Sequence, residues 1–69
     1  MTKTVRLNGK ATAIEAATVI ALIEELNIKG APRGIAVAVN GAVVPRTSWP
    51  ARDLAAGDEI EIVRATQGG

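Results

Sequence analysis

The chain has 69 residues, contains no cysteine and no histidine, and carries a formal net charge of +1 at neutral pH. This length allows one small domain. Without cysteine the chain forms no disulfide or thiolate metal site, and without histidine it lacks the commonest metal ligand and general base. The near-neutral charge and single tryptophan argue against nucleic-acid binding. We therefore expect no metal site, no cofactor of its own, no nucleic-acid partner and no independent enzymatic activity.

The N-terminal segment gives no sign of a targeting signal. It mixes charged and apolar residues and lacks the continuous apolar stretch of a secretory signal. The longest strongly apolar run, residues 16–23, is far shorter than a membrane span. We expect a cytoplasmic protein that does not associate with membranes.

Alternating apolar and polar residues around an Asn-Gly pair predict an N-terminal β-hairpin. Its strands cover residues 3–7 and 10–14, and Asn8-Gly9 joins them. A two-residue type I′ turn requires positive φ at both central positions, which Asn and Gly tolerate. In the first strand, Val5 and Leu7 alternate with polar residues, so that one face is buried and the other exposed.

The hydrophobic period changes after this hairpin and predicts one α-helix. Apolar residues at the spacing i, i+3, i+4 and i+7 form one stripe, made by Val19, Leu22, Ile23 and Leu26. Thr18 is a suitable N-cap, since its hydroxyl accepts a hydrogen bond from a free backbone N–H. Asn27 suits the left-handed conformation that ends a helix.

A second Asn-Gly pair predicts a second hairpin. Asn40-Gly41 lies between a strand over residues 35–39 and a shorter strand over residues 42–44. Pro45 ends the shorter strand, because proline has no N–H to donate to a sheet. Residues 46–56 then form an irregular connection.

That connection contains a short helical turn after Ser48, and Trp49 fills the end of a core that has no other aromatic residue. The last strand covers residues 58–65. Its alternation places Ile60 and Ile62 inside the fold. The outward residues are Glu59, Glu61 and Val63.

The charged side chains form no catalytic constellation. Glu59 and Glu61 share a strand face with no base or metal ligand beside them, so we interpret them as solvent-exposed surface. Asp58 is interpreted as a turn residue, since Asp bonds its local backbone. Arg46 and Arg64 either steer an acidic partner or are ordinary surface charge.

The order of these elements predicts an α+β fold. One face of a sheet is enough to bury the apolar stripe of a single helix. The first and last strands are the natural central pair, and parallel pairing between them requires a right-handed crossover that includes the helix. We therefore predict a ubiquitin-like β-grasp, with a mixed sheet of four to five strands packed on one helix. The domain covers residues 1–65, and residues 66–69 form a flexible C-terminal tail.

The tail ends in Gly68-Gly69 and presents the α-carboxylate of Gly69. Glycine has no Cβ, so this tip is thin enough to enter a narrow cleft. The carboxylate has an ordinary pKa of about 3.3–3.7 and is ionised at neutral pH, which makes it a poor electrophile. It requires activation by ATP, and the chain has no nucleotide-binding motif. A partner enzyme must therefore perform any reaction at this carboxylate.

Four stretches of the sequence carry a family likeness. They are the predicted helix at residues 18–26, the segment 37–49 with its Asn-Gly, Val-Pro-Arg and Trp, the Leu-x-x-Gly-Asp strand start at residues 54–63, and Gly68-Gly69. Together they resemble the ThiS-type ubiquitin-like sulfur carrier proteins of thiamine biosynthesis over nearly the whole chain. Ala56 and Pro50 depart from the family pattern, and both lie in the predicted irregular connection.

The resemblance implies a function for the tail. A ThiF-like adenylyltransferase adenylates the Gly69 carboxylate with ATP and Mg, and a sulfur donor such as a cysteine desulfurase converts the adenylate to a thiocarboxylate. The thiocarboxylate then delivers sulfur to thiazole synthase. Three residues pass through the partner's active site with the terminus, namely Thr66, Gln67 and Gly68. The candidate docking residues are Val63, Arg64 and Ala65.

Three other functions remain open from the sequence. The chain is alternatively a sulfur carrier for another pathway, such as molybdopterin synthesis. The same activated acyl group also serves a ubiquitin-like modifier, in which Gly69 forms an isopeptide bond to a lysine. The third alternative is a non-covalent β-grasp interaction module whose tail is incidental.

Overall fold

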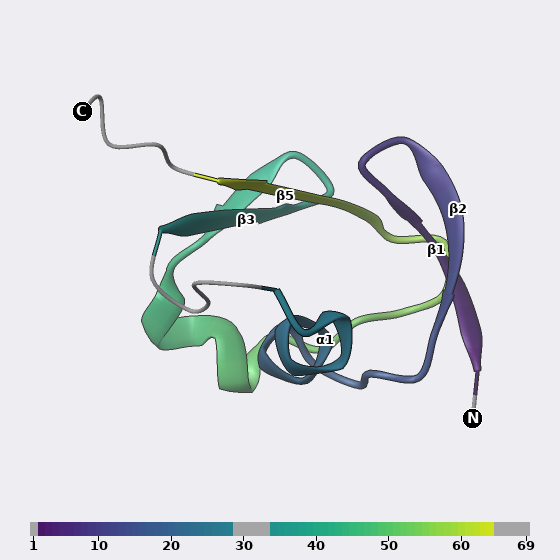
Figure 1. Cartoon of the computed structure of the whole chain (residues 1–69), viewed down its shortest axis with the longest axis horizontal. Coiled ribbons are helices and arrows are strands. Elements are labelled where there is room, and N and C mark those ends of the chain that lie inside the picture. Colours follow the sequence, from purple (N-terminus) through teal and green to yellow (C-terminus); the bar gives the residue numbers. More distant parts are fainter. Residues whose placement is uncertain (1, 29–33, 65–69) are drawn as a thin grey trace.

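A computed structural model describes residues 2–28 and 34–64 of the chain. Five strands form one mixed sheet, and one α-helix packs against it (Figure 1). The elements in chain order are β1 (Lys3–Leu7), β2 (Lys10–Ile14), α1 (Val19–Leu26), β3 (Ile35–Val39), β4 (Ala42–Val44), the 3-10 helix η1 (Arg46–Ala51) and β5 (Glu59–Arg64). This arrangement confirms the predicted α+β β-grasp fold.

β5 lies at the centre of the sheet, whose strand order is β2-β1-β5-β3-β4. β1 runs parallel to β5, with Leu7 opposite Ile60. β3 runs antiparallel to β5, from Ile35 opposite Arg64 to Val39 opposite Ile60. The predicted pairing of the first and last strands is therefore confirmed, and the structure shows that it is parallel.

Both Asn-Gly turns have the backbone that the sequence predicts. The φ angles are 52° at Asn8 and 85° at Gly9, and they are 52° at Asn40 and 84° at Gly41. These positive angles match the right-handed twist of the flanking strands.

The helix begins and ends at the predicted residues. The Oγ1 of Thr18 accepts a hydrogen bond from the backbone N–H of Ala21 at 3.2 Å. Asn27 has φ 51° and ψ 50°, and its N–H donates to the carbonyl of Glu24 at 3.1 Å. The two caps satisfy backbone groups that a short helix otherwise leaves without partners.

The core lies between the sheet and α1. The buried apolar residues come from both layers and from the connections between them: Val5, Ile14, Ala16, Val19, Leu22, Ile23, Val37, Val39, Val44, Trp49, Leu54 and Ile60. Trp49 is 1% exposed, and its Nε1 donates to the carbonyl of Val44 at 2.9 Å. This confirms the prediction that Trp49 fills the core, with its polar atom satisfied.

The connection after β4 differs from its prediction. The 3-10 helix begins at Arg46, ahead of the predicted turn after Ser48. The Ser48 N–H donates to the carbonyl of Pro45 at 2.8 Å, so the first helical bond starts at the proline itself. A 3-10 segment this short has no hydrophobic period that marks its start in the sequence.

Candidate functional site

The predicted reactive terminus follows β5 directly. Ala65, Thr66, Gln67, Gly68 and Gly69 lie outside the described residues. The structure does describe the strand that leads to them, which ends at Arg64 beside the start of β3 (Figure 1). The described part of the candidate site therefore consists of β5 and the residues beside it.

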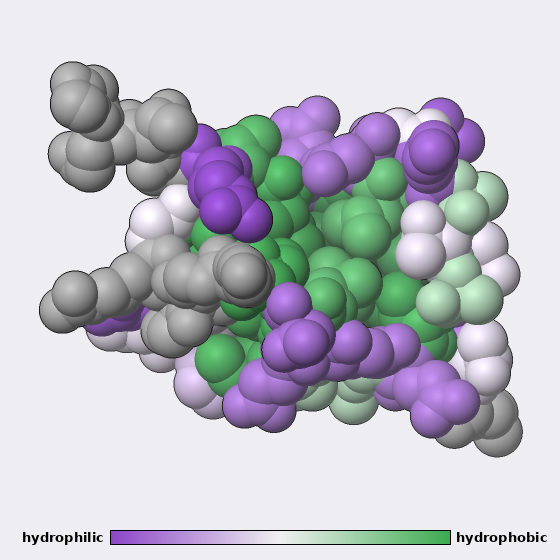
Figure 2. All heavy atoms as spheres, viewed as in Figure 1, coloured by the Kyte–Doolittle hydropathy of each residue, from purple (hydrophilic) through white to green (hydrophobic). Residues whose placement is uncertain are grey.

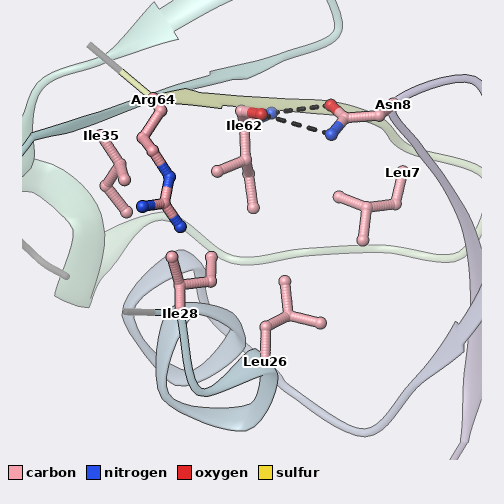
Figure 3. Close-up of a pocket in the computed structure, with 7 residues that line it drawn as sticks. All are labelled: Leu7, Asn8, Leu26, Ile28, Ile35, Ile62 and Arg64. Atoms are coloured by element: carbon pink, nitrogen blue, oxygen red, sulfur yellow. Dashed lines mark hydrogen bonds between the residues drawn. The ribbon is translucent and has the colours of Figure 1, made fainter. Parts of the chain in front are cut away.

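Asn8 holds the outgoing end of β5. Its Oδ1 accepts from the N–H of Ile62 at 2.9 Å, and its Nδ2 donates to the carbonyl of Ile62 at 3.2 Å (Figure 3). Its own N–H donates to the carbonyl of Ile60 at 2.8 Å. The side-chain amide thus continues the contact with β5 beyond Leu7 and Ile60, the last register pair of β1 and β5.

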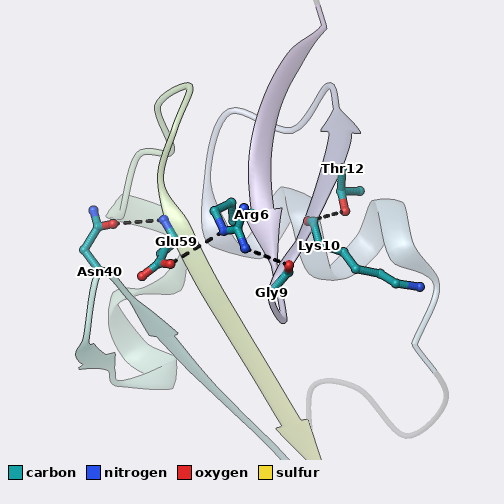
Figure 4. A network of polar contacts seen from close by, with 6 residues as sticks. All are labelled: Arg6, Gly9, Lys10, Thr12, Asn40 and Glu59. Carbon is teal, nitrogen blue, oxygen red and sulfur yellow. Dashed lines mark hydrogen bonds and ion pairs between the residues drawn. The ribbon is translucent and has the colours of Figure 1, made fainter.

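Asn40 holds the incoming end of β5. Its Oδ1 accepts from the N–H of Glu59 at 2.9 Å (Figure 4). Its N–H donates to the carbonyl of Glu59 at 2.7 Å. Its Nδ2 donates to Oδ1 of Asp58 at 3.0 Å. The second turn is therefore tied to both the backbone and a carboxylate at the start of β5.

Asp58 links this contact to the preceding turn. Its Oδ2 accepts from the N–H of Ala55 at 2.8 Å, which confirms the turn role predicted from the sequence. The hydrogen bond from Ala55, assisted by the amide of Asn40, holds the pKa of Asp58 below its ordinary value, although desolvation opposes the shift. The sequence analysis did not predict the hydrogen bonds from Asn8 and Asn40 to β5. An asparagine amide carries the same donor and acceptor groups as a peptide unit, and this similarity is the one sequence feature that could have suggested such bonds.

Val63 belongs to an apolar patch on the sheet face that points away from α1. Val63 is 56% exposed and Val43 is 76% exposed, the two large apolar side chains most open to solvent in the described residues. Ala36 lies opposite Val63, and Ala38 lies opposite Val43 in the strand register. These four residues, here called the outer patch, border a shallow hollow of about 210 Å³ together with Glu61 and Val37.

Arg64 lies on the other side of the sheet. Along β5, Ile60 is buried and Ile62 is partly buried, and the strand alternation places Arg64 on the same side as both. The predicted docking residues Val63 and Arg64 therefore face opposite ways. Arg46, the other candidate for steering a partner, is exposed on η1.

Charges on the outer face lie beside the outer patch. The Nε of Arg6 lies 3.7 Å from Oε2 of Glu59, and the Arg6 guanidinium also donates to the carbonyl of Gly9 at 2.9 Å (Figure 4). Glu59 and Glu61 are both exposed, as predicted.

Residues 2–28 and 34–64 contain no group of three or more metal-ligating side chains. In the same residues, no helix is both long and apolar enough to cross a membrane.

Comparisons with known proteins agree on one family. A sequence model of the ThiS family matches residues 5–69. The chain is similar to a crystal structure of the thiamine biosynthesis protein ThiS from Geobacter metallireducens, with a TM-score of 0.83, 28% identity, and coverage of 96% of this chain and 99% of that chain. A solution NMR structure of a thiamine biosynthesis protein from the same organism gives a TM-score of 0.76, 28% identity, and coverage of 96% and 87%. No curated protein matches the chain.

Proposed function

This chain belongs to the ThiS family of sulfur carriers in thiamine biosynthesis, and from this premise we propose that its cargo is a thiocarboxylate at Gly69. The observation that carries the proposal is that the family match extends to the last residue, through the terminal Gly68-Gly69. β5, which leads into these residues, is held on both sides by hydrogen bonds from Asn8 and Asn40. The strand is thus a firm base for a thin, reactive tip.

The chemistry proceeds in three steps on the partner's side. The Gly69 carboxylate attacks the α-phosphorus of ATP, bound with Mg by a ThiF-like adenylyltransferase, and pyrophosphate leaves. The terminal sulfur of a persulfide on a sulfur donor, such as a cysteine desulfurase, then attacks the acyl adenylate and displaces AMP, and a thiol reductant cleaves the S–S bond of the resulting acyl disulfide to release the thiocarboxylate. The resulting thiocarboxylate is a soft nucleophile that thiazole synthase receives. The carrier contributes the acyl group, and the active sites belong to its partners.

The outer patch is the proposed docking surface for the adenylyltransferase. Val63 lies three residues before Thr66, the first of the residues predicted to pass through the active site, so contact at the patch positions the tail close to that site. The patch gains free energy from burial because Val43 and Val63 are largely exposed in the free carrier. Ala65 extends this surface in the sequence, and Thr66, Gln67 and Gly68 then pass through the active site.

A labelling experiment tests the proposed cargo. The chain is incubated with a ThiF-like enzyme, ATP, Mg, a sulfur donor and a thiol reductant, and is then treated with iodoacetamide. Because the chain contains no cysteine, rapid alkylation at neutral pH identifies the thiocarboxylate. The intact mass rises by the difference between sulfur and oxygen before alkylation. Since oxidation of Met1 gives the same nominal increase, fragmentation must place the sulfur at Gly69.

The control is the chain without Gly69, which should take neither sulfur nor label. A wild-type chain that gains neither adenylate nor sulfur contradicts the proposal. Higher-mass conjugates that form instead, and that disappear when Gly69 is removed, favour the modifier alternative. Full activity of a chain that lacks Gly68-Gly69 favours the non-covalent module.

A further inference from the structure

The partly buried apolar side chains of this protein gather at one place. In the described part of the chain, five of the seven that pack around the core border a single cavity of about 200 Å³ at the outgoing end of β5. These five are Leu7, Leu26, Ile28, Ile35 and Ile62, and with Asn8 and Arg64 they form what is here called the inner groove (Figure 3). Figure 2 shows the same region as apolar surface between the sheet and the helix, with hydrophilic side chains around it.

Among the described residues that line the groove, Arg64 alone is charged. The guanidinium of Arg64 extends from β5 toward Ile28, across the opening between the sheet and the end of the helix (Figure 3). Within residues 2–28 and 34–64, it makes no hydrogen bond or ion pair. The amide of Asn8, by contrast, is already bonded to the backbone of Ile62. Arg64 is therefore the polar group that a ligand of the inner groove meets.

A guanidinium beside aliphatic side chains selects a particular chemistry. Its parallel N–H donors match the two oxygens of a carboxylate, and the apolar walls exclude water from that contact on one side. The walls gain free energy when a branched apolar side chain covers them. A phosphate would satisfy the guanidinium and leave the walls exposed to water, so an acidic and aliphatic peptide segment fits both parts.

We propose that the inner groove docks an acidic, aliphatic segment of the adenylyltransferase that acts on the C-terminus. A leucine-like side chain enters between Leu26 and Ile62, and a neighbouring carboxylate pairs with Arg64. The protein's own residues 65–69 contain no large apolar side chain, which favours a partner segment over the tail as the occupant. The choice of partner enzyme rests on the proposed function, whereas the chemistry of the groove does not.

This assignment gives the two faces of β5 separate docking roles. Val63 presents the outer patch, and Arg64 presents the inner groove, one residue later on the opposite face. A partner that contacts both holds the base of the tail from two sides.

The first test measures adenylation by pyrophosphate exchange at varied carrier concentration. Arg64→Glu should raise the KM for the carrier about tenfold with kcat unchanged, because truncation or reversal of a docking charge weakens binding rather than chemistry. Lys10→Glu is the matched control, since Lys10 is an exposed residue at the start of β2 that does not line the inner groove, and the net charge changes equally. Arg64→Gln, a milder change, should fall between them. Equal KM values for Arg64→Glu and Lys10→Glu overturn the proposal, provided that thermal unfolding shows both variants folded.

The second test needs no enzyme. The full chain, labelled for NMR, is titrated with a capped Gly-Glu-Leu-Glu-Gly peptide and, separately, with the peptide in which Lys replaces Glu. The acidic peptide should shift the methyl signals of Ile35 and Ile62 and the Nε–H signal of Arg64, and Arg64→Glu should abolish these shifts. Equal responses to the two peptides, or no response in the groove, overturn the proposal. If the acidic peptide binds the inner groove but the ThiF-like enzyme does not adenylate the chain, the proposed function is wrong and the proposed chemistry of the groove is supported.

Discussion

The two Asn-Gly turns have almost the same backbone and hold β5 by different chemistry. Their φ angles differ by no more than 1° at corresponding positions. Among the residues that the structure describes, Asn8 bonds only to the peptide groups of Ile60 and Ile62, near the end of the strand. Asn40 bonds to the peptide groups of Glu59 and also to the carboxylate of Asp58, at the start of the strand.

This difference shows how one local motif acquires two tertiary roles. The conformation of each turn depends on the dipeptide, whereas its contacts depend on which part of β5 lies beside it. The bonds of Asn8 involve neutral groups alone, so they are insensitive to pH. The bonds of Asn40 include an ionised group, whose lowered pKa makes them sensitive to acid.

The largest effect should come from removing both amide side chains. The double variant Asn8→Gly, Asn40→Gly keeps residues that tolerate positive φ and removes four side-chain hydrogen bonds. We expect a loss of about 1–3 kcal/mol in the free energy of unfolding, measured with urea, since exposed hydrogen bonds contribute at the lower end of their usual range. Asn27→Gly is the matched control, because Asn27 has φ 51° and no side-chain hydrogen bond in the described structure. A double variant no less stable than this control contradicts the role given to both turns.

The single variants should separate the two ends of β5, each with a loss of about 0.5–1.5 kcal/mol. Asn8→Gly should accelerate hydrogen exchange at the N–H of Ile62, which loses its acceptor. Asn40→Gly should accelerate exchange at the N–H of Glu59 instead. If the two variants accelerate the same amides equally, β5 opens as one unit and the comparison fails.

A smaller, pH-dependent effect should distinguish the second turn. The pKa of Asp58 is lower in the folded state than its ordinary value of 3.8, so its carboxylate stabilises the fold above that pH and loses this contribution as the pH falls through the folded value. Asp58→Asn should therefore be less stable than wild type at neutral pH, and the gap should shrink below about pH 4. The loss in Asn8→Gly should stay constant over the same pH range. A gap for Asp58→Asn that does not change with pH removes the proposed distinction.

The smallest effect should come from the exposed ion pair beside the second turn. Glu59→Gln removes the charge that faces Arg6. It keeps the hydrogen bond from the backbone N–H of residue 59 to Oδ1 of Asn40. The change in unfolding free energy should be within about 0.5 kcal/mol, because exposed ion pairs contribute little. A loss as large as that of Asn40→Gly assigns the stabilisation to the Glu59 side chain and not to its backbone.

The sequence was a good guide wherever the determining residues are close together in the chain. The period of Val19, Leu22 and Ile23 predicted the buried stripe of the helix, and alternation along β5 predicted its inward and outward sides. Trp49 was placed in the core because the chain offers no other aromatic residue. The clear alternation of β1 and β5 predicts that these two strands pair, and the handedness of crossovers is compatible with the parallel direction that the structure shows.

Side-chain contacts between residues distant in the chain could not be predicted from the sequence. Asn8 and Ile62 are 54 residues apart, and no local pattern marks an amide that bonds to a strand so far along the chain. The inner groove draws its lining from β1, the end of α1, β3 and β5, so its existence depends on the finished packing. Alternation did place Val63 outward, yet only the assembled groove shows what Arg64 faces on the other side.

The central position of β5 also decides how the molecule bears a mechanical load. A partner that draws the C-terminus into its active site pulls along β5 from the Arg64 end. Because β5 is hydrogen-bonded to β1 on one side and to β3 on the other, this force acts in shear on both ladders, and many bonds share it. An edge strand such as β4 peels away one bond at a time when it is pulled across its length. The strand that the partner pulls is thus the central strand, which resists the force through hydrogen bonds on both of its edges.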